Sequence, residues 1–179
     1  MIQVISRRLT SYIFKQGVYQ ESFEIHCYGI EVLISTIINV SLILILGLIT
    51  NHFVDSIIFY LGFWIIRKFS GGYHCKTYFR CISTHVFTFV VFLITSSIFE
   101  YQNVMIAVEI FGFLVFLTLS PIKNRKCEKE DYRKYKILSM ALLFFYIILS
   151  WFTAYSGILT YIILTVSFYM LICIPKKYV

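Results

Sequence analysis

The polar stretch at residues 67–81 reads RKFSGGYHCKTYFRC and separates two apolar runs, residues 53–66 and 82–99. It contains four cations, two adjacent glycines, one histidine and two cysteines. Apolar runs joined by short charged connections are typical of a chain that crosses a membrane several times. The stretch therefore predicts an all-α membrane protein in which this connection lies at a membrane surface and carries reactive side chains.

The composition of the whole chain also indicates a membrane protein. Its 179 residues are 59% hydrophobic and 14% charged, whereas soluble domains have about 45–50% apolar and about 25% charged residues. The mean hydropathy is +0.81. The net charge of +7 does not indicate nucleic-acid binding, because the cations form short clusters between apolar runs. The five cysteines show no repeated spacing, so we expect reduced thiols.

Six apolar runs predict six transmembrane helices in one polytopic domain that covers residues 1–179. The segments outside these runs, from the N-terminal one to the C-terminal one, carry three, zero, four, zero, seven, zero and two of the 16 Lys and Arg residues. Because Lys and Arg collect on the cytoplasmic side, we expect both termini and the stretch at residues 67–81 in the cytoplasm, and the protein in the cell membrane. The second run is short but is kept, since removing it would invert every later connection. The expected spans are residues 32–49, 53–66, 82–99, 104–119, 137–155 and 157–174.

Residues 1–30 are too polar to cross a bilayer. Within them Ile5, Leu9 and Tyr12 recur at helical spacing, together with Ile13. This pattern predicts an amphipathic interfacial helix. A loosely ordered tail that only tethers the first span is the alternative.

Cys81 has the surroundings of a nucleophilic thiol. A cysteine attacks as its thiolate, and the pKa of a thiol falls beside cations, beside a histidine or at a helix amino terminus. Cys81 follows Arg80 and directly precedes the apolar run at residues 82–99. We therefore predict Cys81 as the nucleophile and His74 as its base.

The spacing of His74 and Cys81 requires a turn. Seven residues of straight helix would put the two side chains on one face but about 10 Å apart, whereas proton transfer needs about 3 Å. Gly71 and Gly72 allow a positive φ and a sharp turn, which would lay His74 back over the helix that begins near Cys81.

Other polar residues have alternative interpretations. Cys75 adjoins His74, but sequence neighbours diverge on a helix or strand, so it is expected to be a bystander. Ser70 and Thr77 are either hydrogen-bond donors to the site or ordinary loop residues. The whole stretch is alternatively a charged connector without chemistry. Carboxylates that could orient the histidine lie outside it, at Glu24, Glu31, Asp55 and Glu109.

A zinc site is the competing chemistry. His74, Cys75, Cys81 and His85 are four zinc-type ligands, and the last two lie one helical turn apart. No paired motif such as CxxC or HExxH accompanies them, and the four nearby cations disfavour a dication. We therefore expect neither a metal nor a cofactor.

The pattern Arg67-x3-Gly71-Gly72-x-His74-x6-Cys81, placed between the second and third apolar runs, resembles the accessory gene regulator B (AgrB) family of Gram-positive quorum-sensing systems. The hydropathy and loop charges of most of the chain agree with that family. Residues 120–125, with the sequence SPIKNR, carry a weaker similarity.

This resemblance implies a membrane cysteine endopeptidase that removes the C-terminal tail of a short signalling-peptide precursor and keeps the remaining peptide as a thioester on Cys81. His74 would serve as general base or acid, supported by Arg67, Gly71 and Gly72. An internal Cys or Ser of the peptide would then close a thiolactone or lactone ring. The implied partners are this precursor, with its acidic tail, the lipid bilayer and, as an alternative to a monomer, a second copy of the chain.

Two other functions fit the apolar runs. A transporter or exporter would use the intramembrane acids Asp55 and Glu109, and a non-catalytic scaffold would bind a partner through the cationic connections. Loss of function on replacing Cys81 or His74 is expected only for the peptidase.

Overall fold

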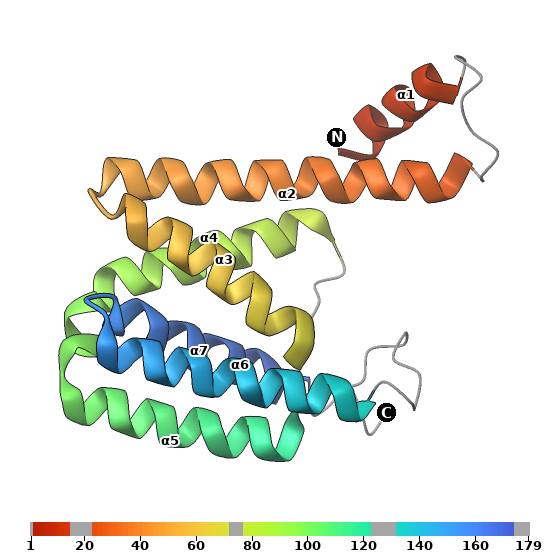
Figure 1. Ribbon diagram of the computed structural model, residues 1–179. Helices are drawn as coiled ribbons and strands as arrows, with labels where there is room; N and C mark the ends of the chain where they lie inside the picture. The colour runs from red at the N-terminus through yellow and green to blue at the C-terminus, as the bar shows by residue number, and fades with distance from the viewer. Residues whose placement is uncertain (1, 15–22, 72–76, 123–131, 174–179) are drawn as a thin grey trace.

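The computed structural model describes residues 2–14, 23–71, 77–122 and 132–173. No strand occurs in these ranges, which confirms the predicted all-α class (Figure 1). The elements are α1 (Ile2–Phe14), α2 (Phe23–Ile49), α3 (Phe53–Ser70), α4 (Tyr78–Thr95), the 3₁₀ helix η1 (Ser96–Glu100), α5 (Gln102–Leu119), α6 (Tyr132–Phe152) and α7 (Ser156–Leu171).

Four stretches of helix are long and apolar enough to cross a bilayer: α2, the Tyr78–Phe99 stretch of α4 and η1, α5 and α6. The expected spans at residues 53–66 and 157–174 fall on α3 and α7, which are not among the four. Asp55, Arg67 and Lys68 lie within the 18 residues of α3, and α7 has only 16 residues. The structure therefore supports a membrane protein, while the count of six spans stays a prediction.

The last described helix, α7, lies at the centre of the bundle. Eleven of its 16 residues are buried, and α3, α5 and α6 pack around it. A helix that is apolar on all sides is expected in such a core position. Tyr161 of α7 is packed among aromatic rings, with its ring centroid 5.3 Å from that of Phe92 and 5.2 Å from that of Phe99.

The helices alternate in direction between two ends of the bundle (Figure 1). The carboxyl ends of α3, α5 and α7 lie at the same end as the amino ends of α2, α4 and α6. The helix ends that flank residues 72–76 and 123–131 therefore lie at one end of the molecule. We call it the loop end.

The helix α1 packs along the first half of α2 (Figure 1). Its polar residues Ser6 and Thr10 are buried against α2, whereas Ile5, Leu9 and Tyr12 are exposed. The amphipathic helix expected within residues 1–30 is thus present over Ile2–Phe14. Its location at the membrane interface stays a prediction.

Candidate active site

The predicted catalytic stretch is described at both of its ends. Residues 67–71 close α3, and residues 77–81 open α4. His74, Gly72 and Cys75 lie outside the described residues, so the predicted pairing of His74 with Cys81 stays a prediction.

Cys81 lies at the loop end, in the beginning of α4. The helix starts at Tyr78, earlier than the expected span, because the Thr77 hydroxyl caps it by accepting a hydrogen bond from the Arg80 N–H at 3.4 Å. The Cys81 N–H donates to the Thr77 carbonyl at 3.1 Å, so it cannot also hold an oxyanion. The residue is half-buried. Because Cβ bonds tilt toward the amino end of a helix, the thiol leans toward the positive end of the helix dipole.

Gly71 has the positive φ that its position in the sequence predicts, with a value of 77°. A Cβ added there would lie 2.7 Å from the Ile122 carbonyl oxygen. The Ile122 N–H donates to the Ser70 carbonyl at 3.0 Å. Glycine is therefore needed both for the backbone conformation and for this close approach.

The contact of Ser70 and Gly71 with Ile122 joins the two segments on which the sequence resemblance rests. Ser70, Ser120 and Ser139 are fully buried nearby, and the hydroxyls of Ser120 and Ser139 lie 2.5 Å apart. Ser70 is therefore a structural residue in this arrangement. No local pattern signals this contact, because the segments lie some fifty residues apart in the sequence.

Arg67 turns into the helix bundle. Its Nη1 donates to Nε2 of His85 at 3.2 Å. The guanidinium carbon lies 5.4 Å from the ring centroids of both Phe63 and Tyr169, a cation–π arrangement. Arg67 therefore contacts α4 and α7 from the end of α3, while its supporting role in catalysis stays a prediction.

His85 contacts α2 through its other ring nitrogen, because Nδ1 lies 2.7 Å from Nδ2 of Asn39. With the Arg67 cation hydrogen-bonded to Nε2, His85 cannot ligate zinc in this arrangement. Within the described ranges no group of three or more His, Cys, Asp and Glu residues could hold a metal ion. In the sequence His85 stands out only as a zinc-type ligand, and Asn39 only as a polar residue within an apolar run.

Two of the candidate carboxylates lie far from Cys81. Asp55 binds Nδ1 of His52 at 2.7 Å near the beginning of α3, about 18 Å along the helix from Arg67. Glu109 is buried and accepts hydrogen bonds from Ser150 at 2.6 Å and the Trp151 indole at 3.0 Å. This geometry favours a role in packing for Glu109.

Glu31 is the candidate carboxylate that contacts α4. Its carboxylate lies close to the Tyr78 phenol, three residues before Cys81. It also accepts a hydrogen bond from Ser6 at 3.3 Å, and the Cys27 thiol lies 4.0 Å away. The structure thus connects α1, α2 and the start of α4 through one carboxylate.

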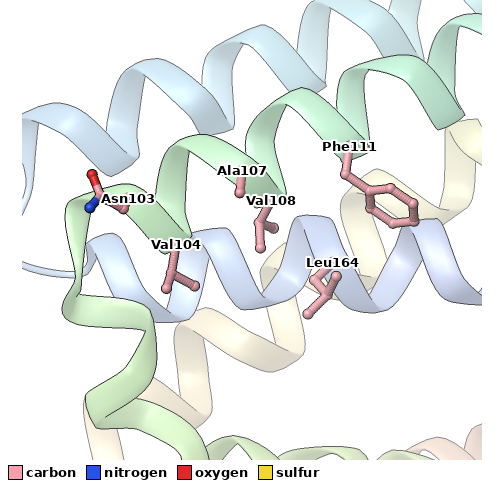
Figure 2. Close-up of a pocket in the computed structure, with 6 residues that line it drawn as sticks. All are labelled: Asn103, Val104, Ala107, Val108, Phe111 and Leu164. Atoms are coloured by element: carbon pink, nitrogen blue, oxygen red, sulfur yellow. The ribbon is translucent and has the colours of Figure 1, made fainter.

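A pocket of about 340 Å³ lies away from Cys81, between α5 and α7 (Figure 2). Its lining is apolar apart from one amide and contains no titratable side chain, so it offers no peptidase chemistry. Its residues are Asn103, Val104, Ala107, Val108, Phe111 and Leu164.

Comparisons with known proteins point to one family. The family model for accessory gene regulator B matches residues 6–174. A protein of Clostridium perfringens strain 13, provisionally named AgrB-like protein 2, is 31% identical over 145 residues, which cover 75% of this chain and 68% of the relative. An AgrB-like protein of C. perfringens strain SM101 is 28% identical with the same coverage. No solved structure matches the chain significantly.

Proposed function

Because this chain belongs to the accessory gene regulator B family, we propose that it is a membrane cysteine endopeptidase that processes a signalling-peptide precursor. The observation that carries the proposal is the place of Cys81. This half-buried residue lies in the beginning of a helix, at the end of the bundle where Ser70 and Gly71 contact Ile122.

The proposed reaction has two transfers of an acyl group. The Cys81 thiolate attacks the scissile carbonyl, and His74 gives the departing amine its proton, so that the C-terminal tail leaves and a thioester forms. An internal Cys or Ser of the bound peptide then loses its proton to His74 and attacks the thioester. The ring closes and the Cys81 thiol is released. Because thioester and thiolactone are similar in energy, holding the internal nucleophile close must favour cyclisation over hydrolysis.

The topology forms part of the proposal. The helices α2 to α7 would all cross the cell membrane as one domain, with the loop end and both termini in the cytoplasm. The cations near that end would then attract an acidic precursor tail. A homodimer is the alternative to a monomeric peptidase.

Co-expression with a candidate precursor tests the proposal. Wild type, Cys81→Ala, His74→Ala and Cys75→Ala are compared by gel and mass spectrometry for the released tail and for a peptide thioester that hydroxylamine cleaves. Tail release should vanish in the first two variants and persist in Cys75→Ala. Processing by Cys81→Ala would refute the peptidase assignment and favour a transport assay on Asp55 and Glu109 variants.

A further inference from the structure

The first half of α4, which carries Cys81, has less apolar packing than the second half. The buried residues of α4 are Thr88, Phe89 and Phe92, all beyond its tenth residue. Residues 78–86 are only partly buried or exposed. Other contacts must therefore hold the helix at the level of Cys81.

Two polar contacts to α2 lie on either side of Cys81. The Tyr78 phenol, three residues before it, lies close to the Glu31 carboxylate, and His85, four residues after it, contacts Asn39 at 2.7 Å. The helices α2 and α4 run in the same direction from the loop end (Figure 1). These two contacts therefore fix the height and rotation of the thiol relative to α2.

The donor and acceptor roles of His85 follow from its partners. A guanidinium has only donors, so Nε2 of His85 accepts from Arg67 at 3.2 Å and the ring carries its proton on Nδ1. That proton needs an acceptor. The side-chain oxygen of Asn39 makes no hydrogen bond among the described residues while the amide nitrogen faces the ring. Rotating the carboxamide places this oxygen against Nδ1–H and gains a hydrogen bond.

The imidazole also packs against the core. Its ring centroid lies 4.7 Å from that of Phe63, edge to face, and Phe63 is 3% exposed. His85 thus contacts α3 through Arg67 and Phe63 and contacts α2 through Asn39. One neutral side chain connects three helices a single turn below the thiol.

We infer that His85 is a positioning residue, which holds Cys81 in its reactive place by accepting from Arg67 and donating to Asn39. This inference rests on the proposed peptidase function. It predicts that the two ring nitrogens contribute separately, and that their loss changes the reactivity of the Cys81 thiol even without a substrate.

The experiment compares five variants of the full chain in lipid nanodiscs, the fifth being the double variant of His85→Leu with Asn39→Leu. His85→Leu removes both hydrogen bonds. His85→Gln keeps an acceptor near the position of Nε2, and His85→Asn keeps a donor near the position of Nδ1. Phe87→Leu is the matched control, because Phe87 lies on the same helix with 67% of its surface exposed. Each variant is assayed for tail release and for alkylation of Cys81 by iodoacetamide across pH, quantified by mass spectrometry of the Cys81 peptide.

We expect His85→Leu to lower kcat for tail release by about tenfold to a hundredfold, the effect of losing a hydrogen bond to a charged group, with KM little changed. His85→Gln and His85→Asn should each recover part of this loss, and Phe87→Leu should match wild type. The pH profile of Cys81 alkylation should shift in His85→Leu. Adding Asn39→Leu to His85→Leu should cause little further loss, because both remove the same contact.

A folded His85→Leu protein with wild-type tail release and an unshifted alkylation profile would overturn the inference. Equal losses in all three His85 variants with unchanged alkylation would also overturn it, since they would indicate a general structural role. Alkylation needs no precursor, so it tests the positioning of Cys81 even if the wild-type chain releases no tail and the peptidase proposal fails.

Discussion

The helices α2 and α7 are both strongly apolar, yet the bundle buries them in opposite ways. Eleven of the 16 residues of α7 are buried, against five of the 27 residues of α2. Those five, Cys27, Ser35, Asn39, Ile43 and Gly47, lie on one row with a spacing of four or eight residues. Three of them have polar oxygen, nitrogen or sulfur side chains.

This difference shows that the apolar content of a helix does not predict whether the helix lies at the centre or on the outside of a membrane protein. In water the apolar side of a helix faces inward, but lipid removes that preference, and the polar row of α2 is then the side that faces protein. The helix α7 is buried because α3, α5 and α6 pack around it. Substitutions on the two helices and their neighbours should therefore have unequal effects.

The largest effect is expected for a methyl group added where α5 meets α7. Gly112→Ala would place a Cβ 2.3 Å from the buried Ile163 side chain, and such overpacking costs about 1–3 kcal/mol. Gly29→Ala on α2 is the matched control, because nothing lies within 4 Å of its Cβ and alanine favours helix. Unfolding by SDS titration in mixed micelles measures both. Equal stabilities would show that α7 is not the tightly packed centre.

An intermediate effect, on activity more than on stability, is expected for Glu31→Gln. The change weakens the hydrogen bond that Glu31 accepts from Ser6 and removes the negative charge beside the Tyr78 phenol, and tail release should fall about threefold to tenfold. Glu24→Gln is the comparison, since Glu24 is an exposed carboxylate on the same helix. A larger loss of tail release in Glu24→Gln than in Glu31→Gln would contradict the importance of the contacts that Glu31 makes.

The smallest effect is expected for Leu33→Ala, on the outer face of α2. Leu33 is 58% exposed, and we expect lipid to cover it, so the free energy of unfolding should change by no more than about 0.5 kcal/mol. The same SDS titration measures it. A loss above about 2 kcal/mol, the cost of truncating a core leucine, would mean that protein covers this face, as a second copy of the chain would.

Local sequence patterns predicted the features that depend on near neighbours. The all-α class, the amphipathic helix at Ile2–Phe14 and the positive φ of Gly71 each follow from periodicity or from one residue type. The helix α4 begins at Tyr78, before the apolar run that starts at residue 82, because its cap is a polar threonine at 77.

Features that join distant segments had no local signal. The contacts of Arg67 with His85 and of His85 with Asn39 span 18 and 46 residues, and each depends on how three helices pack. Asn39 lies in the middle of an apolar run, and nothing near it in the sequence indicates that it contacts His85. The central place of α7 is equally invisible in its composition, which is as apolar as that of a lipid-facing helix.

The central place of α7 has a consequence for biosynthesis. A ribosome delivers α7 after the other described helices, and domains generally acquire structure from the amino terminus during synthesis. Until α7 has been synthesised, the aromatic rings of Phe92 and Phe99 therefore lack their contact with Tyr161. The helices α3, α5 and α6 likewise lack the helix around which they pack. A nascent chain that ends before α7 would lack the central helix. The complete bundle can therefore form only after residue 171 has been synthesised.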